Sequence, residues 1–306
     1  LYCWDAQGFV SRGKDKKMKK IKKLLAYFGI FSNNIKIHGI KYDGVRTSKA
    51  LQEFFLNKNF EIEMFIFLKS LAYDSMIDAG AYFGYFSIYF NKVHKSAEVV
   101  AFEADIDNYN RLNHFIKANA STVKAYNQAV GDVEGEIDFY KPAYDGTTKY
   151  PTHGQIGDPS KDETNLYKGK RYIKRTVKTK PLKDIISEFA NGHTLLKLDI
   201  EGYEEKALRS VEKELMHLND LDIIVELMIN DTNAADIFSF LTNCGYSGYL
   251  MTNAGLVAED RPLVMPYANQ NPQDQKLRTV WKNHFFTKKS ASEIRKINID
   301  AYNYHI

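Results

Sequence analysis

The residues best placed to do chemistry lie in one short stretch in the second half of the chain. Lys197, Asp199 and Glu201 alternate at the end of an apolar run, residues 194–198, that reads as a buried strand, and alternate residues of a strand share one side. Burying ionisable groups costs free energy, so buried ones are usually paired with an opposite charge or take part in the function. Three ionisable groups at this position therefore indicate a functional site. The alternative is an ion pair of Lys197 with Glu201, with Asp199 capping the next helix.

A second stretch, residues 76–87, predicts a ligand-binding turn. Residues 76–79 read as a short buried strand, and Gly80 and Gly84 permit a tight turn before a helix begins. A strand, a turn and a helix N-terminus gather free N–H groups and a positive dipole end at one point. The carboxylate of Asp78 at that point argues against a bare phosphate and for a ligand with hydroxyls or positive charge. An ordinary tight turn is the alternative.

More polar residues are expected where the next two strands end. Residues 98–102 read as an apolar strand followed by Glu103, and residues 123–130 as a strand broken by Asn127 and Gln128. The carboxyl ends of parallel strands meet at one edge of a sheet, where ligands bind, and an acidic residue there can accept both hydroxyls of a ribose. NAD sites share that feature, but the third glycine of the dinucleotide fingerprint is missing here.

Strands and helices alternate along the chain, which predicts an α/β fold with a doubly wound, mostly parallel sheet and helices on both faces. Helical segments are also expected at residues 48–56, 60–72, 107–119, 181–189 and 233–244, and from the end of the 197–204 motif to residue 215. Five further segments read as strands, residues 135–140, 173–180, 222–227, 246–251 and 279–287.

Segments of different character flank and interrupt the predicted domain of residues 45–290. Residues 1–44 form a basic extension with an amphipathic helix at 14–29, which could lie on a membrane, contact nucleic acid, or simply cover the domain with a solvated face. Residues 141–172 read as an irregular insertion, from which His153 and Gln155 could touch a substrate. Residues 291–306 read as a polar tail.

Composition narrows the class of protein. The chain has 306 residues, 26% of them charged, and a formal net charge of +4, as expected for a soluble globular protein. Two cysteines, Cys3 and Cys244, cannot form a disulfide framework, so a reducing, cytoplasmic location is expected. Because the sequence has no run of about 18 uncharged apolar residues, no membrane span is expected.

The motifs together resemble those of the FkbM family of methyltransferases, in order and in spacing. The resemblance covers about residues 51–286, and its most specific part is Lys-x-Asp-x-Glu-Gly-x-Glu at residues 197–204. The other matching motifs are residues 78–85, 102–103 and 127–130. The family usually has Asn at the position of Tyr82 and Pro at that of Ala104, and both departures lie beside the expected cofactor site.

The resemblance implies a Rossmann-like class I methyltransferase with a seven-stranded sheet and S-adenosylmethionine as cofactor. The implied reaction is O-methylation of a sugar, glycan or small metabolite. Asp199 is then the first candidate for cofactor positioning or for the catalytic base, with Glu201 and Glu226 as alternatives. Lys197 would orient these carboxylates. Glu226 could also contact the substrate, and no residue is assigned to a metal. The implied cofactor-binding residues are Asp78, Gly80, Ala81, Tyr82, Gly84, Ser87, Glu103, Ala104, Asn127, Gln128 and Ala129.

Two other functions remain open at this point. A nucleic-acid-modifying methyltransferase is suggested by the basic helix and by the lysines and arginines of the insertion, although no RNA-binding motif supports it. A cofactor-binding or interaction protein without catalysis is suggested by Tyr82 and Ala104. The expected partner is a small-molecule or glycan acceptor, and nucleic acid is not expected. The basic helix could make peripheral contact with a membrane.

Overall fold

The computed structural model of the chain describes residues 34–43, 61–143, 154–156, 171–228, 232–252, 255–259 and 281–303. The predicted basic helix at 14–29, the predicted helix at 48–56 and His153 lie outside these residues, so what was expected of them stays a prediction. No helix in the described part is long and apolar enough to cross a membrane.

The main sheet runs in the order β13-β12-β14-β11-β10-β3-β4-β5. Its parallel strands are β3 (Ser75–Ala79), β4 (Glu98–Phe102), β5 (Lys124–Tyr126), β10 (Thr194–Leu198) and β11 (Leu221–Met228). Its antiparallel strands are β12 (Ser247–Thr252), β13 (Gly255–Glu259) and β14 (Trp281–Thr287). From β3 the sheet grows one way through β4 and β5 and the other way through β10 and β11, so strand order reverses between β3 and β10.

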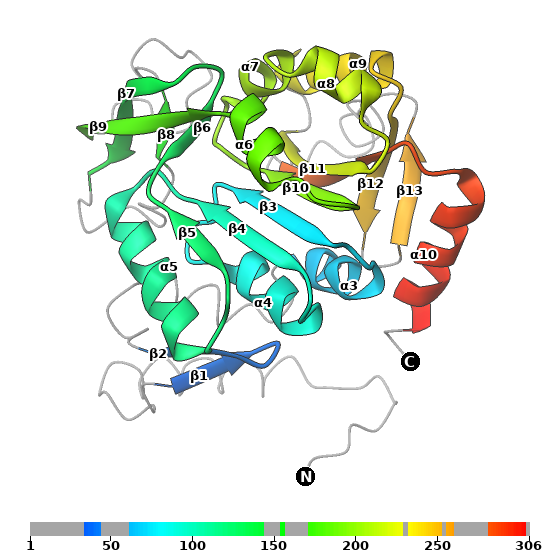
Figure 1. Cartoon of the computed structure of the whole chain (residues 1–306), viewed down its shortest axis with the longest axis horizontal. Coiled ribbons are helices and arrows are strands. Elements are labelled where there is room, and N and C mark those ends of the chain that lie inside the picture. Colours follow the sequence, from blue (N-terminus) through cyan, green and yellow to red (C-terminus); the bar gives the residue numbers. More distant parts are fainter. Residues whose placement is uncertain are drawn as a thin grey trace, which may run out of the picture.

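Helices cover both faces of this sheet (Figure 1) and enclose two separate apolar cores. One face carries α3 (Ile62–Ser70), α4 (Tyr85–Val93), α5 (Ile106–Ala118) and α10 (Ala291–Asn303). The other carries α6 (Leu182–Phe189), α7 (Glu204–Arg209), α8 (Glu212–His217) and α9 (Thr232–Asn243). Successive residues of a strand face opposite cores, as Met76 and Ile77 of β3 do. The predicted doubly wound α/β fold is confirmed, with one strand more than the seven expected in the main sheet, because β13 pairs with β12 at its edge.

A second sheet has the order β6-β9-β7-β8. Its strands are β6 (Ala129–Gly131), β7 (Gly135–Pro142), β8 (Gln155–Ile156) and β9 (Tyr172–Pro181). The predicted break at Asn127 and Gln128 therefore separates strands of two different sheets. The insertion predicted to be irregular over 141–172 needs correction, since β7 enters it, β8 lies within it and β9 begins at its end.

Both predicted ends of the domain also need correction. The hairpin of β1 (Asn34–Ile37) and β2 (Ile40–Asp43) precedes the expected start at Val45, yet Ile40 and Tyr42 are buried in the core. The Tyr42 ring lies 5.1 Å from the ring of Phe115 in α5. The expected polar tail forms α10, and its Ile294 and Ile297 are buried in the same core. The packed domain is thus wider than 45–290.

Candidate functional site

The carboxyl edge of the parallel strands holds a buried charge cluster centred on Lys197. Asp78 of β3 pairs in register with Lys197 of β10, which pairs with Ile224 of β11. The Nζ atom of Lys197 lies 2.9 Å from Oδ2 of Asp199 and 3.7 Å from Oδ1 of Asp78. It also lies 5.4 Å from the ring centre of Phe86, so the cluster faces α4. The Lys197 and Asp78 side chains are only 3% and 1% exposed.

Lys197 remains charged in this setting. Burial alone would lower the pKa of Lys197, but Asp199 and Asp78 raise it above its ordinary value. Burial raises the pKa of Asp78, although Lys197 and a hydrogen bond from Ser87 act against it. A lysine that keeps its proton cannot be the base, and it can orient the carboxylates as expected. The observed partner of Lys197 is Asp199, and the N-cap of the next helix is Tyr203, so the alternative in which Asp199 caps that helix is wrong.

The loop after β10 is held by one carboxylate. Glu204 accepts hydrogen bonds of 2.8 Å from the backbone N–H of Ile200 and from that of Gly202. Between them Glu201 has φ of 56°, a left-handed conformation that is strained for a residue with a side chain. The N-cap of α7 is Tyr203. Burial raises the pKa of Glu204 to about 7. Through its two hydrogen bonds, Glu204 shapes the loop that carries Glu201.

The glycine turn after β3 is packed against that loop. Gly80 and Gly84 have φ of 80° and 78°. A Cβ atom on Gly80 would lie 1.8 Å from the carbonyl oxygen of Asp199, so residue 80 must be glycine for the two backbone segments to approach so closely. The expectation of free N–H groups needs correction here: the N–H groups of Gly80 and Ala81 both donate to the carbonyl oxygen of Phe102, at 2.9 Å.

Glu103 ends β4 and accepts hydrogen bonds from the loops on both sides. Its Oε2 accepts from the N–H of Tyr82 at 2.8 Å, and its Oε1 from the N–H of Asp105 at 2.9 Å. Burial raises the pKa of Glu103 to about 7. Tyr82 has φ of 52°, a region in which Asn is several-fold enriched. That explains physically why Asn suits this position and why Tyr is a departure.

Asn127 fastens the backbone next to Glu103. Its Nδ2 donates to the carbonyl oxygens of Glu103 and Ala104, at 2.8 and 3.0 Å. Gln128 is partly buried and Ala129 begins β6. The structure therefore gathers the residues predicted around β3 and β4 at one edge, and their contacts to a cofactor stay a prediction.

Sequence reasoning missed Asp105, which lies beside Glu103. Its Oδ1 accepts from the N–H groups of Asp107 and Asn108, at 2.9 and 3.1 Å, and so caps α5. Lys141 of β7 lies 3.1 Å from the same oxygen atom. This pairing joins the second sheet to the edge of the main one. An acidic residue just before a helical pattern is the signal that could have identified the cap.

Glu226 lies one strand further along the same edge. Leu198 pairs with Val225, which sets Asp199 level with Glu226, and Glu226 pairs directly with Asn283 of β14. Burial first, and then the charges of Asp199, Glu61 and Glu201, raise the pKa of Glu226 well above its ordinary value, with Lys197 acting against them. Glu61, before α3, and the buried Asn283 were missed because they lie outside every motif.

Gln155 lies elsewhere in the fold. It pairs with Tyr140 in the second sheet instead of ending a strand of the main one, and its contact with substrate stays a prediction.

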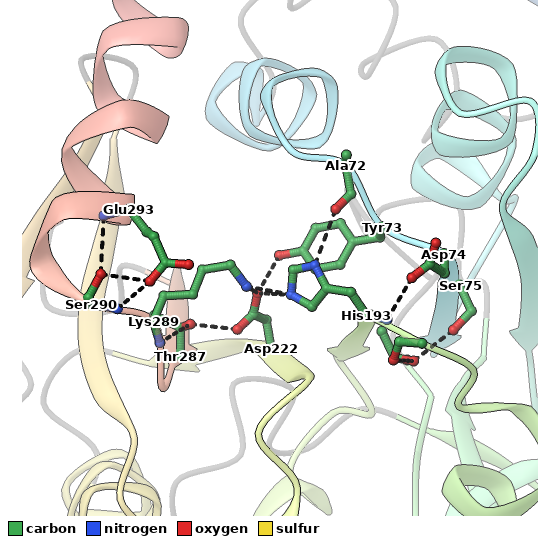
Figure 2. Close-up of polar contacts among 12 residues, drawn as sticks. Ala72, Tyr73, Asp74, Ser75, His193, Asp222, Thr287, Lys289, Ser290 and Glu293 are labelled. Carbon is green, nitrogen blue, oxygen red and sulfur yellow. Dashed lines mark hydrogen bonds and ion pairs between the residues drawn. The ribbon is translucent and has the colours of Figure 1, made fainter.

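A different polar cluster occupies the opposite, amino edge (Figure 2). Asp222, at the start of β11, accepts hydrogen bonds from Tyr73 and His193 at 2.9 Å, and also from Lys289 and Thr287. Burial alone would raise the pKa of Asp222, but hydrogen bonds from His193, Lys289 and Thr287 lower it below its ordinary value. The cluster ties the segment before α10 to the sheet.

Comparison with known proteins identifies the family. The model of the methyltransferase FkbM domain matches residues 78–247, more than half of the 306-residue chain. The chain belongs to the FkbM methyltransferase family. "Methyltransferase 1" of Beauveria bassiana is 26% identical over 213 residues, which cover 64% of this chain and 79% of that protein. The FkbM match includes Asp78, Glu103, Asp199 and Glu226, whereas Glu61 and Asn283 lie outside it.

Solved methyltransferase structures are similar over most of this FkbM-family chain. The METTL16 MTase domain is 10% identical, covers 93% of this chain and 99% of its own, and has a TM-score of 0.44. An rRNA methylase from Streptococcus thermophilus is 11% identical, covers 74% and 94%, and has a TM-score of 0.39.

Proposed function

We propose that this FkbM-family methyltransferase uses S-adenosylmethionine to methylate a hydroxyl oxygen of a sugar, glycan or small-metabolite acceptor. The observation that carries the proposal is the cluster of carboxylates around Lys197 at the point where strand order reverses. In open α/β sheets ligands bind in the crevice at that point.

The charges of the edge fit the donor. Asp78, Asp199, Glu201 and Glu226 are carboxylates from neighbouring strands and loops, and Lys197 is the cation that faces them. An excess of carboxylates favours a ligand that carries a positive sulfonium and disfavours the pyrophosphate of NAD. The same excess disfavours a phosphate-rich acceptor such as nucleic acid.

Two buried carboxylates retain capacity to accept hydrogen bonds from a ligand. Oδ1 of Asp78 is buried and accepts no hydrogen bond from the described residues. Oε2 of Glu103 accepts the N–H of Tyr82, and a carboxylate oxygen has about two acceptor positions, so a ribose hydroxyl could share it. The residues of this edge therefore fit an adenosyl group with a cationic sulfonium. We infer that Asp78 and Glu103 hold the donor.

Methyl transfer requires the protein mainly to position the two reactants and to take a proton. The bound donor supplies an electrophilic methyl group. The chain's own groups would hold the acceptor oxygen in line with that methyl group and take its proton. Lys197 fixes Asp199 at 2.9 Å, and Glu204 fixes the conformation around Glu201, so both carboxylates are preorganised. The departure at Tyr82 leaves its N–H on Glu103, which supports an active protein over one without catalysis.

A transfer assay tests the function. The protein would be incubated with methyl-labelled S-adenosylmethionine and separate pools of neutral sugars, lipid-linked glycans and RNA. We expect label in a neutral hydroxylated fraction, as an ether stable to mild base. Label in RNA alone would contradict the proposed acceptor class, and no label above a Lys197→Met control in any pool would contradict the activity.

A further inference from the structure

The polar cluster at the amino edge contains a histidine whose two ring nitrogens are both in contact with polar groups (Figure 2). Nδ1 of His193 lies 3.2 Å from the carbonyl oxygen of Ala72, and Nε2 lies 2.9 Å from Oδ2 of Asp222. Nε2 also contacts Nζ of Lys289, which donates to the same oxygen of Asp222. One ring nitrogen therefore faces both a carboxylate and an ammonium group, and these make opposite demands on it.

The groups on the two sides of the ring select one tautomer of neutral His193. A carbonyl oxygen only accepts hydrogen bonds, so Nδ1 must carry the hydrogen that faces Ala72. The ammonium group of Lys289 only donates, so Nε2 must present its lone pair to it. Neutral His193 is thus expected to carry its hydrogen on Nδ1, while Lys289 bridges Nε2 and Asp222.

Asp222 has no acceptor position to spare on that side. Its Oδ1 accepts from Thr287, and its Oδ2 accepts from Tyr73 and Lys289. Because a carboxylate oxygen has about two acceptor positions, a hydrogen on Nε2 of His193 can bond to Oδ2 only in exchange for one from Lys289.

Protonation of the ring forces that exchange. With hydrogens on both nitrogens, His193 keeps its bond to Ala72 and donates to Asp222 across 2.9 Å. Lys289 then loses Nε2 as an acceptor, and the positive ring repels its ammonium group. The long side chain of Lys289 is 17% exposed, so it can turn toward water.

The charged and titratable groups that face His193 in the described part of the chain come from three segments. The segment before β3 supplies Tyr73, whose ring lies 4.4 Å from the imidazole, and Asp74, which accepts the backbone N–H of His193. β11 supplies Asp222, and the segment after β14 supplies Lys289. Of these groups only Lys289 carries the same charge as a protonated imidazole.

Lys289 lies directly before the C-terminal helix. The next residue, Ser290, exchanges hydrogen bonds with Glu293 at the start of α10. The helix packs against α3 and β13, and its Ile294 and Ile297 are buried in the core. Release of Lys289 therefore loosens the segment from which α10 begins.

We propose that His193, Lys289 and Asp222 form a pH-sensitive latch on α10. The latch is closed when neutral His193 accepts a hydrogen bond from Lys289, and open when protonated His193 takes the place of Lys289 on Asp222. Histidine is the side chain whose charge ordinarily changes between about pH 5 and pH 8, so acidification opens the latch. It lies at the amino edge and needs no ligand, so it does not depend on the proposed function.

The closed state can be tested in wild-type protein. With isotope-labelled histidine, magnetic resonance spectra that correlate ring nitrogens with ring hydrogens show which nitrogen carries the hydrogen, and the signal lost in His193→Gln assigns the residue. At about pH 8 we expect a hydrogen on Nδ1 and none on Nε2. A hydrogen on Nε2, with or without one on Nδ1, would overturn the latch.

Two neighbouring lysines provide a matched pair of variants. In Lys289→Met, Nε2 of His193 should carry a hydrogen, because the carboxylate of Asp222 is a stronger acceptor than a carbonyl group. Lys288 donates to carbonyl oxygens of α8 instead, so Lys288→Met should leave Nε2 without a hydrogen. An Nε2 that stays without a hydrogen in folded Lys289→Met would also overturn the latch.

Hydrogen exchange of the backbone amides of α10 measures the opening. After correction for the intrinsic effect of pH, exchange in wild type should be roughly tenfold faster at about pH 5 than at about pH 8, as expected for loss of a hydrogen bond to a charged group. His193→Gln should remove this difference, whereas His217→Gln, at an exposed histidine of α8, should keep it. Equal exchange at both pH values in wild type, or a difference that persists in His193→Gln, contradicts the proposal.

Discussion

Nζ of Lys197 and Oδ2 of Asp199 lie 2.9 Å apart, and the same nitrogen lies 3.7 Å from Oδ1 of Asp78. One buried lysine therefore joins the strand expected to hold the donor, β3, to the strand expected to face the acceptor, β10. Because breaking a buried pair leaves an uncompensated charge, replacement of Lys197 should affect both functions together.

Replacement of Asp199 by Asn tests how the carboxylates share the work. The negative charge of Asp199 raises the pKa of Glu226. Glu226 is one of the candidate bases. We therefore expect Asp199→Asn to shift the acidic limb of the pH–rate profile to lower pH, because Glu226 ionises at lower pH without that charge. The loss of rate at high pH should be smaller than for Glu226→Gln, for which general-base loss predicts about a hundred- to ten-thousandfold. An unmoved limb in Asp199→Asn, with a greater loss than in Glu226→Gln, would assign the role of base to Asp199.

Glu204 should be required for the geometry of its loop. A glutamine side chain has one carbonyl oxygen to offer, so Glu204→Gln leaves one of the N–H groups of Ile200 and Gly202 without its partner. We expect a loss of about 1–3 kcal/mol in unfolding free energy, measured by chemical denaturation. Glu205→Gln is the matched control, since Glu205 makes an exposed ion pair with Arg209. Equal stability of the two variants would remove Glu204 from the support of the loop.

The amino-edge cluster should stabilise the fold in a pH-dependent way. Asp222 is fully buried and its pKa is lowered by the hydrogen bonds from His193, Lys289 and Thr287. A depressed carboxyl pKa contributes stability above the ordinary value of 3.8, and that contribution is lost as the pH falls below it.

Asp222→Asn should therefore destabilise the protein at neutral pH by about 3–5 kcal/mol, the range for breaking a buried pair. The gap from wild type should narrow in acid. Thermal unfolding between pH 3 and pH 7 measures it, with the exposed Asp220→Asn as control. If the difference in stability between wild type and Asp222→Asn widened in acid, ionised Asp222 would not be the stabilising form.

The hairpin before residue 44 should belong to the folding unit. Ile40 and Tyr42 are buried against α4 and α5. A chain that begins at residue 44 loses both side chains, and loss of a buried aromatic side chain alone costs about 3–5 kcal/mol. A chain that begins at residue 33 keeps them. We expect only the longer chain to match the full chain in melting temperature, and equal melting of all three would make the hairpin dispensable.

The strands that carry the site could be predicted because they are short, apolar and followed by unusual residues. Residues 194–198 form the predicted strand β10, and residues 98–102 the predicted β4. The polar break at 127–128 was visible too, since Asn and Gln interrupt an apolar run. Spacing could not show that the break leads to a second sheet, because pairing of β6 with β9 joins segments far apart in the chain.

Other parts of the site depend on long-range register. Asn283 lies beside Glu226 only because β14 runs antiparallel to β11, and Glu61 approaches from the helix before β3. The position of Glu201 was predicted wrongly for a different reason: alternation placed Glu201 on one side of the strand with Lys197 and Asp199, whereas Glu201 lies in a left-handed turn beyond the strand. Ile294 and Ile297 were passed over because polar residues surround them in the sequence.

The most direct test of the donor site is calorimetric titration of the full chain with S-adenosylmethionine and, separately, with NAD. The carboxylates at the edge should favour the sulfonium ligand, and Glu103→Ala should weaken it by about 1–3 kcal/mol through the loss of buried hydrogen bonds. Glu98→Ala, at the other end of the same strand, should leave affinity unchanged. We predict binding of S-adenosylmethionine and none of NAD; tight NAD binding without S-adenosylmethionine binding would contradict the proposed donor.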